Sequence, residues 1–443
     1  MLNIVDNDLG QKKIGKLLLQ YSIPAIIATT ATSIYNIVDR IFIGQIVGPL
    51  AISGLTLTLP IMNIATALGT LVGSGAATMI SIRLGEKRRN VAFRTLGNAV
   101  ILNLLIGIIF SLLGLLFIDE ILTFFGASPL TLPYAKKFIT IILIGNPITQ
   151  MFFSLNTILR ASGYPSKAMW SVLVTMFLNL FFVFLFVYHF NWGIEGAALA
   201  TVVGQFFGLC IVLTHFWNKN SNIHFKTFAF TFRWNITRHI FSIGLSPFLL
   251  HLCTCLVVAI FNWQLVNYAG DYAVGAYGII NTIVGFVTVI ILGLAHGMQP
   301  IVGYNYGAKQ YKRVTRTFWL TVAIGITIAT LGFILMWLYP LQIAYWFTTD
   351  FLLSELIRSG LKIYILMFPI LGFQIVASNF FQSIGKPRLS ILLSISRQII
   401  FLIPAIIILP YYYGLNGIWY AMPIADFLST ILAVILFARL KLQ

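Results

Sequence analysis

Apolar residues occur along this chain in long, almost uninterrupted runs, separated by short polar connections. A helix needs about 20 mostly apolar residues to cross the hydrocarbon core of a membrane. Twelve runs are that long, and they cover approximately 17–41, 51–76, 95–117, 138–159, 168–188, 194–216, 240–267, 274–300, 317–338, 359–382, 389–411 and 416–438. The pattern therefore predicts an all-α integral membrane protein with twelve transmembrane helices.

The charged residues are few and lie mainly on one side of this predicted bundle. They make up 9% of the 443 residues, against about 25% in soluble proteins. Of the 28 Lys and Arg residues, 22 fall in the N-terminus, the even-numbered connections and the C-terminus, and four on the opposite side. Because cytoplasmic connections carry the excess of positive charge, we predict that both termini are cytoplasmic and that the protein lies in the cytoplasmic (inner) membrane. The net charge of +17 then reflects the orientation of the chain in the membrane. We therefore expect membrane lipid as a partner and no nucleic acid.

The two halves of the chain repeat each other on either side of a polar, basic connection at 217–239. A shift of 222 residues aligns Gly75 with Gly297, Lys87 with Lys309, Gly163 with Gly385 and Pro165 with Pro387, and a shift of 221 aligns Gly193 with Gly414 and Phe206 with Phe427. Each half contains six spans, so both halves enter the membrane in the same direction. We therefore predict an N-terminal six-helix lobe (1–216), a cytoplasmic linker (217–239) and a C-terminal six-helix lobe (240–443), related by a pseudo-twofold axis along the membrane normal.

An acidic residue, Asp39, lies near the outer end of the first predicted span. Tyr35 and Asn36 precede it by four and three residues, hence on the same face of a helix. An ionisable group within a membrane helix is costly and usually functional, which makes Asp39 a candidate for binding a coupling ion. The alternative is a carboxylate at the membrane edge that pairs with Arg40 or is solvated.

Two neutral polar residues of the first half are predicted to reach a similar depth. At 1.5 Å per residue, Asn179 lies about 18 Å up the fifth span and Thr201 about 12 Å below the outer end of the sixth, in a core about 30 Å thick. Together with Asp39 they would supply enough oxygen atoms to hold Na⁺ or a titrating proton. Asn156 is a further candidate, at a deeper level. The alternative is that these residues form separate hydrogen bonds between helices.

The second half places two opposite charges within spans. Asp426 and Arg397 stand about 19 and 13 Å above the cytoplasmic ends of the twelfth and eleventh spans, within the reach of an arginine side chain. We interpret them as a structural or gating ion pair. A second ion site is the alternative.

Motifs of soluble enzymes do not occur in the sequence. We find no glycine loop for phosphate, no histidines at metal-ligand spacing and no supported Ser-His-Asp set, and the three cysteines lie in apolar runs. We therefore expect no enzymatic activity, no cofactor and no certain metal site, although Na⁺ at Asp39 stays open. Without an ATP site, energy for transport would come from an ion gradient.

Several segments resemble the multidrug and toxic compound extrusion (MATE) transporters, and the resemblance extends over essentially the whole chain. The segments are SIYNIVDRIFIGQIVG (33–48), TILRASGYPSKA (157–168), GIEGAALATVVGQ (193–205), GLAHGMQPIVGYNYGAK (293–309), FFQSIGKPRLS (380–390) and GLNGIWYAMPIADF (414–427). The resemblance implies two six-helix lobes around a V-shaped cavity and export of small organic, often cationic, compounds against Na⁺ or H⁺. It also implies that Asp39, Asn179 and Thr201 match the family's ion-site residues.

The sequence departs from the family at one position. Many relatives carry a second acid four residues after the matching Asn, whereas this chain has Val183. A cation site with two carboxylates is therefore in doubt, and the loss of one negative charge favours H⁺ over Na⁺ as the coupling ion. An acid introduced at position 183 would be expected to restore the second carboxylate one turn from Asn179.

Three other functions remain as alternatives. A flippase for lipid-linked saccharides belongs to the same broader superfamily, but usually has fourteen spans and a more cationic cavity. An intramembrane acyl or glycosyl transferase needs clustered His, Asp or Glu, and here the six histidines are dispersed. A channel uses rings of like residues from an oligomer, whereas this chain repeats internally, so we expect a monomer.

The orientation can be tested with single cysteines in a variant that lacks the native ones. A cysteine at Ser128 should react with an impermeant thiol reagent added outside intact cells, and one at Asn220 should react only after the membrane is opened. The reverse pattern would contradict the predicted orientation.

Overall fold

The computed structural model describes the backbone of residues 4–46 and 49–440, and the side chains of residues 8–35, 54–270 and 272–440. The described chain is helical and contains no strand. Eleven of its helical segments are long and apolar enough to cross a membrane, and a twelfth crossing is made by two helices that meet at a bend of 59°. The prediction of twelve spans is confirmed.

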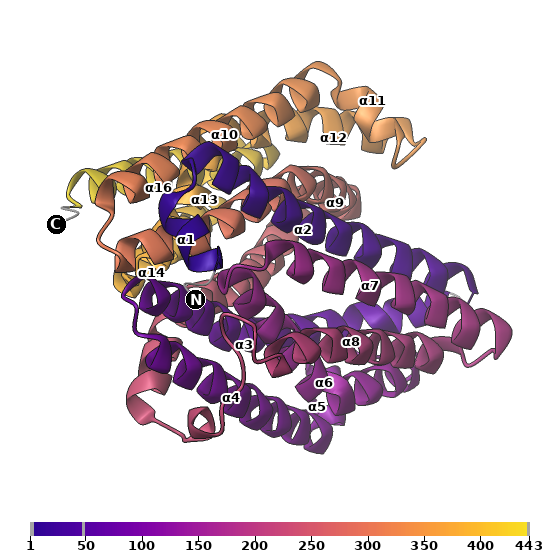
Figure 1. Cartoon of the computed structure of the whole chain (residues 1–443). Helices are drawn as coiled ribbons and strands as arrows, with labels where there is room; N and C mark the ends of the chain where they lie inside the picture. The colour runs from indigo at the N-terminus through magenta and orange to yellow at the C-terminus, as the bar shows by residue number, and fades with distance from the viewer. Residues whose placement is uncertain (1–3, 47–48, 441–443) are drawn as a thin grey trace. The chain divides into compact units, whose positions relative to one another are not determined.

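The helices follow one another along the chain as Figure 1 shows. In the first half they are α1 (Ile4–Gln11), α2 (Ile14–Ile46), α3 (Pro49–Gly85), α4 (Arg89–Leu116), α5 (Ile118–Phe124), α6 (Leu132–Ala161), α7 (Pro165–Val183), the π-helical turn η1 (Phe184–His189) and α8 (Gly193–Trp217). The second half contains η2 (Thr227–Phe230), α9 (Trp234–Gly307), α10 (Tyr311–Leu338), α11 (Pro340–Tyr345), α12 (Phe351–Tyr364), α13 (Phe368–Ser383), α14 (Pro387–Ile395), the π-helical turn η3 (Ser396–Leu402), α15 (Ile403–Tyr413) and α16 (Leu415–Ala438).

Helix packing divides the chain into two compact units. Unit 1 comprises the residues up to Lys12, Ile27–Phe248 and Gly303–Lys309, and unit 2 comprises Lys13–Ile26, Leu249–Val302 and the residues from Gln310 onward. In unit 1, α6 packs against α3, α4, α7 and α8, and in unit 2, α13 packs against α10, α14 and α16. The helices α6 and α13 belong to the fourth and tenth spans, which the predicted repeat aligns. The fourth span of each half thus packs against several neighbours, although in unit 2 the last helix, α16, packs against more elements (α12, α13, α14, η3 and α15).

Residues that the predicted repeat aligns also share unusual backbone angles. The φ angle is 60° at Lys87 and 58° at Lys309, and it is 56° at both Gly193 and Gly414. Gly163 and Gly385, directly before α7 and α14, likewise have φ angles of 105° and 68°. Side chains rarely adopt this left-handed region, so glycine is favoured where the chain turns between two helices. The repeat is thus visible in the turns as well as in the helices.

The repeat also aligns two sites where helices approach closely. A Cβ atom at Gly75 of α3 would lie 2.1 Å from the carbonyl oxygen of Ile240, within unit 1. A Cβ atom at Gly297 of α9 would lie 2.5 Å from Cα of Ser22, within unit 2. The helices α2 and α9 each pass from one unit to the other just after a proline, Pro24 or Pro247. The predicted lobe boundaries, which keep α2 within the first lobe and divide α9 between the linker and the second lobe, stay a prediction.

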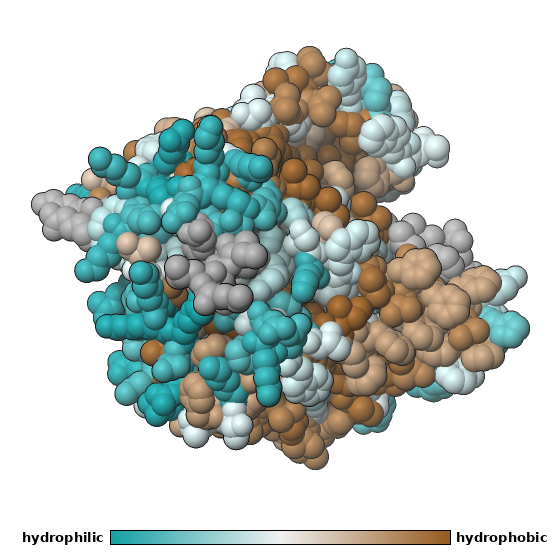
Figure 2. Space-filling view, viewed as in Figure 1, coloured by the Kyte–Doolittle hydropathy of each residue, from teal (hydrophilic) through white to brown (hydrophobic). Residues whose placement is uncertain are grey.

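The surface of unit 1 is polar at one end and apolar along its length. Figure 2 shows hydrophilic residues gathered over the ends of α3 and α4 where these two helices meet, and hydrophobic residues along α7 and α8. On α7, Phe177 is 71% exposed and Phe181 is 52% exposed. Such large exposed apolar side chains fit contact with lipid, because hydrocarbon replaces the water that they would otherwise meet.

Candidate functional site

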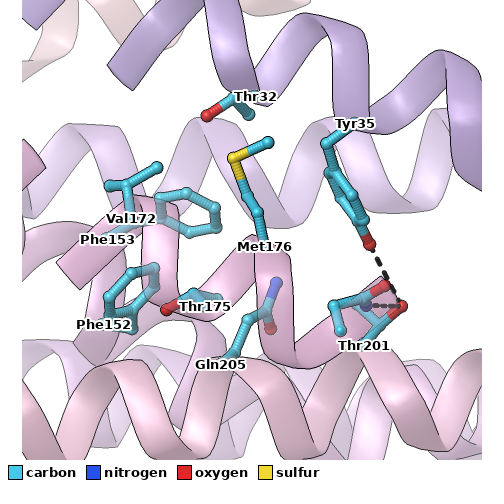
Figure 3. A pocket seen from close by; sticks show the side chains of 10 residues that line it. Thr32, Tyr35, Phe152, Phe153, Val172, Thr175, Met176, Thr201 and Gln205 are labelled. Carbon is cyan, nitrogen blue, oxygen red and sulfur yellow. Dashed lines mark hydrogen bonds between the residues drawn. The ribbon is translucent and has the colours of Figure 1, made fainter. Parts of the chain in front are cut away.

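Four helices of unit 1 line a small, partly open cavity of about 40 Å³ (Figure 3). Its lining comes from α2 (Thr32, Tyr35), α6 (Phe152, Phe153), α7 (Val172, Thr175, Met176, Asn179) and α8 (Thr201, Gln205). A single water molecule needs about 10–15 Å³ measured in this way. The cavity can therefore hold a few water molecules or a small ion with part of its hydration, but not a drug-sized molecule.

The Thr201 hydroxyl is the centre of the polar side of this cavity. Asn179 Nδ2 donates a hydrogen bond to Thr201 Oγ1 at 3.2 Å, and Thr201 Oγ1 in turn donates to the carbonyl oxygen of Ala197 at 3.1 Å. Since the single hydroxyl proton of Thr201 is used, the Tyr35 hydroxyl is the donor across its 3.5 Å contact with Thr201 Oγ1. Figure 3 shows Tyr35 reaching down from α2 to Thr201. One hydroxyl thus connects α2, α7 and α8.

Asn179 leaves one acceptor without a partner. Its side chain is 2% exposed, and Oδ1 is buried with no hydrogen-bond partner among the described residues. A buried acceptor left unpaired costs about 1–3 kcal/mol. A cation, or a proton donor that enters the cavity, would remove that cost. The arrangement can therefore favour a positively charged or proton-donating species beside Asn179.

The opposite side of the cavity is mostly apolar. Phe152 and Phe153 of α6 and Val172 and Met176 of α7 lie there, as Figure 3 shows. Aromatic and methionine side chains adapt to irregular apolar groups. This wall offers an ion no oxygen ligand, so the coordination of an ion in the cavity depends on the polar side.

The structure adds polar lining residues that the sequence argument did not single out. They are Thr32, Thr175 and Gln205, and Gln205 accepts a hydrogen bond from Thr149. Thr175 lies four residues before Asn179, and Gln205 lies four residues after Thr201. Residues four apart share a helix face, so the spacing alone could have identified both.

Two of the predicted residues cannot be placed in this cavity by their side chains. Asn36 and Asp39 belong to helix α2, but their side chains lie outside the described part of the chain. Of the predicted first-half set, the structure brings together Tyr35, Asn179 and Thr201.

Asn156 makes contacts elsewhere. Its Nδ2 donates to the carbonyl oxygen of Ala168 at 2.8 Å and to the Ser171 hydroxyl at 2.7 Å. These bonds tie α6 to the beginning of α7, and Asn156 is not among the residues that line the cavity. This side chain therefore joins two helices of the bundle, and its predicted part in ion binding remains a prediction.

The surroundings of Val183 bear on one expectation. Val183 is fully buried in an apolar cluster with Leu55, Phe138, Val187, Ile194, Ala197, Ala198 and Ala200. The neighbours of Val183 in this cluster are all apolar, and the expectation that an acid here would restore a second carboxylate near Asn179 stays a prediction. The position one turn beyond Asn179 is part of the hydrophobic packing of this chain.

In unit 2 the two predicted charges do meet. Arg397 Nε donates to Asp426 Oδ1 at 2.7 Å, and the side chains are 13% and 4% exposed. Arg397 belongs to the π-helical turn η3 and Asp426 to α16. The pair joins the eleventh and twelfth spans, and its predicted gating role remains a prediction.

Metal ligands are not clustered in the described part of the chain. Within the residues whose side chains are described, no group of three or more His, Cys, Asp or Glu residues could hold a metal ion. The oxygen atoms of the unit 1 cavity come instead from hydroxyl and amide groups. Such neutral ligands suit a monovalent cation when one carboxylate is added to them.

The MatE family model matches the chain twice, over residues 24–185 and 247–408. The second match begins 223 residues after the first, close to the shift found in the sequence. The chain is 26% identical to Multidrug export protein MepA of Staphylococcus aureus (strain MRSA252) over 428 residues, which cover 96% of this chain and 94% of the relative. It is also 26% identical to MepA of Staphylococcus haemolyticus (strain JCSC1435), covering 97% and 95%.

Solved structures share the architecture. A MATE protein in complex with MaL6 gives a TM-score of 0.93 at 23% identity and covers 99% of this chain and 98% of its own. An outward-facing multidrug resistance MATE family transporter of the MOP superfamily gives 0.93 at 22% identity and covers 100% and 98%. The chain therefore has the twelve-helix MATE fold and is a multi-pass membrane protein.

The apolar surroundings of Val183 predict the effect of an acid at this position. Val183→Asp should lower stability by about 2.5–3.5 kcal/mol, because it places a carboxylate among the apolar side chains of this cluster within a membrane helix. Val183→Asn, of similar size and without the charge, is the matched control and should cost less. The thermal unfolding temperature of both purified variants in detergent measures the difference. An Asp variant as stable as the wild type would mean that position 183 faces a polar cavity.

Proposed function

The chain belongs to the MatE family, and from that premise we propose that it exports small organic compounds across the cytoplasmic membrane in exchange for H⁺ or Na⁺. The names of its Staphylococcus relatives, multidrug export proteins matched over almost their whole length, support export as the activity. The small cavity of unit 1 supports the ion part of the proposal.

The main support for the ion site is that Asn179 Oδ1 has no hydrogen-bond partner among the described residues, whereas the neighbouring Thr201 hydroxyl already makes all of its hydrogen bonds. Thr201 Oγ1 accepts from Asn179 and Tyr35 and donates to Ala197, so its hydrogen-bonding capacity is used. Asn179 Oδ1 is the acceptor left over. In our proposal a protonated Asp39 donates to it, or Na⁺ binds to it, each time the site is loaded.

Asp39 supplies the negative charge in this proposal. It follows Tyr35 by four residues on α2, and Tyr35 lines the cavity. A carboxylate in surroundings of low dielectric constant is costly unless a proton or a cation compensates it. H⁺ is the favoured ion, because Val183 stands where many relatives have a second acid. The loss of one negative charge weakens the binding of a metal cation more than the binding of a proton.

Exchange follows if the ion and the exported compound compete for the same charge. A cationic group on the compound would compensate Asp39 as well as an ion does, so that loading one releases the other. If the protein alternates between two conformations during export, the ion shifts the balance between them only if it binds the two with different affinity. In this proposal a single chain with cytoplasmic termini carries out the cycle.

Replacing the carboxylate tests the proposal. Asp39→Asn resembles the neutral form and should abolish gradient-driven export while the protein still inserts and folds. The measurement is export of a fluorescent organic cation by vesicles under an imposed pH or Na⁺ gradient. Export at the wild-type rate under either gradient would place the coupling site elsewhere, with Asp426 as the next candidate.

A second variant separates ion coupling from folding. Thr201→Val keeps the shape of the side chain but leaves the donors of Asn179 and Tyr35 without their acceptor, and it should lower export by about tenfold at the same gradient. Thr214→Val is the matched control on the same helix, since its exposed hydroxyl bonds only to its own helix, at Ile211. Equal effects of the two substitutions would argue against the network.

A further inference from the structure

The ion pair of unit 2 occupies positions that the repeat aligns with the cavity of unit 1. The shift of 222 that aligns Pro165 with Pro387 places Arg397 opposite Thr175. The shift of 221 that aligns Phe206 with Phe427 places Asp426 opposite Gln205. Thr175 and Gln205 both line the cavity of unit 1. The two charges of unit 2 therefore stand where unit 1 has two neutral polar lining residues.

The central polar residues of unit 1 have apolar counterparts in unit 2. The same shifts place Phe401 opposite Asn179 and Met422 opposite Thr201. At these two positions unit 2 lacks the amide and hydroxyl that hold the polar side of the unit 1 cavity, and its amide lies instead at Gln398, opposite the lining residue Met176. Unit 2 also has a carboxylate, which unit 1 lacks at the aligned position, and a guanidinium that contacts it directly.

The contact between the charges is tight and enclosed. Arg397 Nε lies 2.7 Å from Asp426 Oδ1, and the Asp426 side chain is only 4% exposed. The backbone carbonyl of Asp426 accepts from Thr430 Oγ1 at 2.7 Å within α16. Arg397 lies in a π-helical turn, and such turns within helices occur frequently at functional sites.

We propose that the Arg397 guanidinium occupies the place of a bound cation in unit 2, so that Asp426 belongs to a cation site that the chain itself has filled. A guanidinium cannot lose its proton inside a protein, so Arg397 keeps its positive charge throughout a transport cycle. A monovalent cation of the surrounding solution then has no access to Asp426. It follows that the coupling ion binds in unit 1 alone, and this consequence rests on the proposed function. The occupation of the unit 2 site by Arg397 does not depend on the proposed function.

Structural stabilisation is the competing explanation of the pair. Breaking a buried pair by removal of one partner is strongly destabilising in either explanation, because a buried charge is left uncompensated. Loss of stability in an Arg397 variant therefore decides nothing. The two explanations differ in what restores stability: a vacated cation site recovers it from a small cation, and a broken structural contact does not.

Arg397→Gln in the full-length protein is the test variant, and Arg397→Gln with Asp426→Asn is the matched reference, because it has the same shape and no charge. We expect the unfolding temperature of Arg397→Gln to rise by a few degrees with increasing NaCl, with N-methyl-D-glucamine chloride keeping the ionic strength constant. The wild type and the double variant should respond less than Arg397→Gln, and equally to each other, because any Na⁺ that binds in unit 1 acts on all three proteins alike. Arg397→Lys retains a tethered cation and should behave like the wild type.

Two results would overturn the proposal. One is an equal response of the single and double variants to Na⁺, and the other is the absence of any Na⁺ response in a folded Arg397→Gln. If Arg397→Gln does not fold without Na⁺, the yield of folded protein prepared with and without Na⁺ replaces the unfolding temperature as the readout. Because none of these measurements involves export, they stay valid whether or not the Asp39 variants transport.

Discussion

Hydrocarbon offers no hydrogen-bond partner, and the rest of this structure follows from that constraint. The backbone of the described spans is helical because a helix satisfies its own amide and carbonyl groups. Hydroxyl side chains within the spans bond to their own helix, as Thr201 does to Ala197 and Thr175 to Ser171. Amide side chains bond between helices, as Asn156 does to Ala168 and Ser171. Asn103, Gln150, Asn179 and Gln398 each keep a buried amide oxygen without a partner among the described residues. Of these four residues, Asn179 is the one that lines the unit 1 cavity, where a ligand could supply the missing partner.

The internal repeat is preserved in the backbone and has diverged in the side chains. Both halves use left-handed turns at aligned positions, and in both the fourth span of the half packs against several neighbouring helices. The polar groups differ: unit 1 combines neutral oxygens around a cavity, and unit 2 brings Arg397 and Asp426 into contact. Two copies of one helix arrangement therefore offer different chemistry, which an exporter can use if only one unit loads the ion.

The sequence predicted much of the fold because span length and charge placement depend on the membrane. It also predicted that Asn179 and Thr201 meet, since a rise of 1.5 Å per residue fixes their depth. It did not predict that α12 and α13 bend by 59°, because backbone direction at a break depends on tertiary packing. The sequence also did not predict the apolar cluster around Val183, since the members of this cluster come from several helices. Gln205 could have been found from its spacing to Thr201.

The central claim is that export is driven by an ion that binds in the unit 1 cavity. Its most direct test is uptake of a fluorescent organic cation into vesicles that contain the purified protein, with pH and Na⁺ gradients imposed separately and without ATP. The account predicts transport driven by the pH gradient, and weaker or no transport driven by the Na⁺ gradient. Transport that runs equally in the absence of both gradients would contradict ion-coupled export.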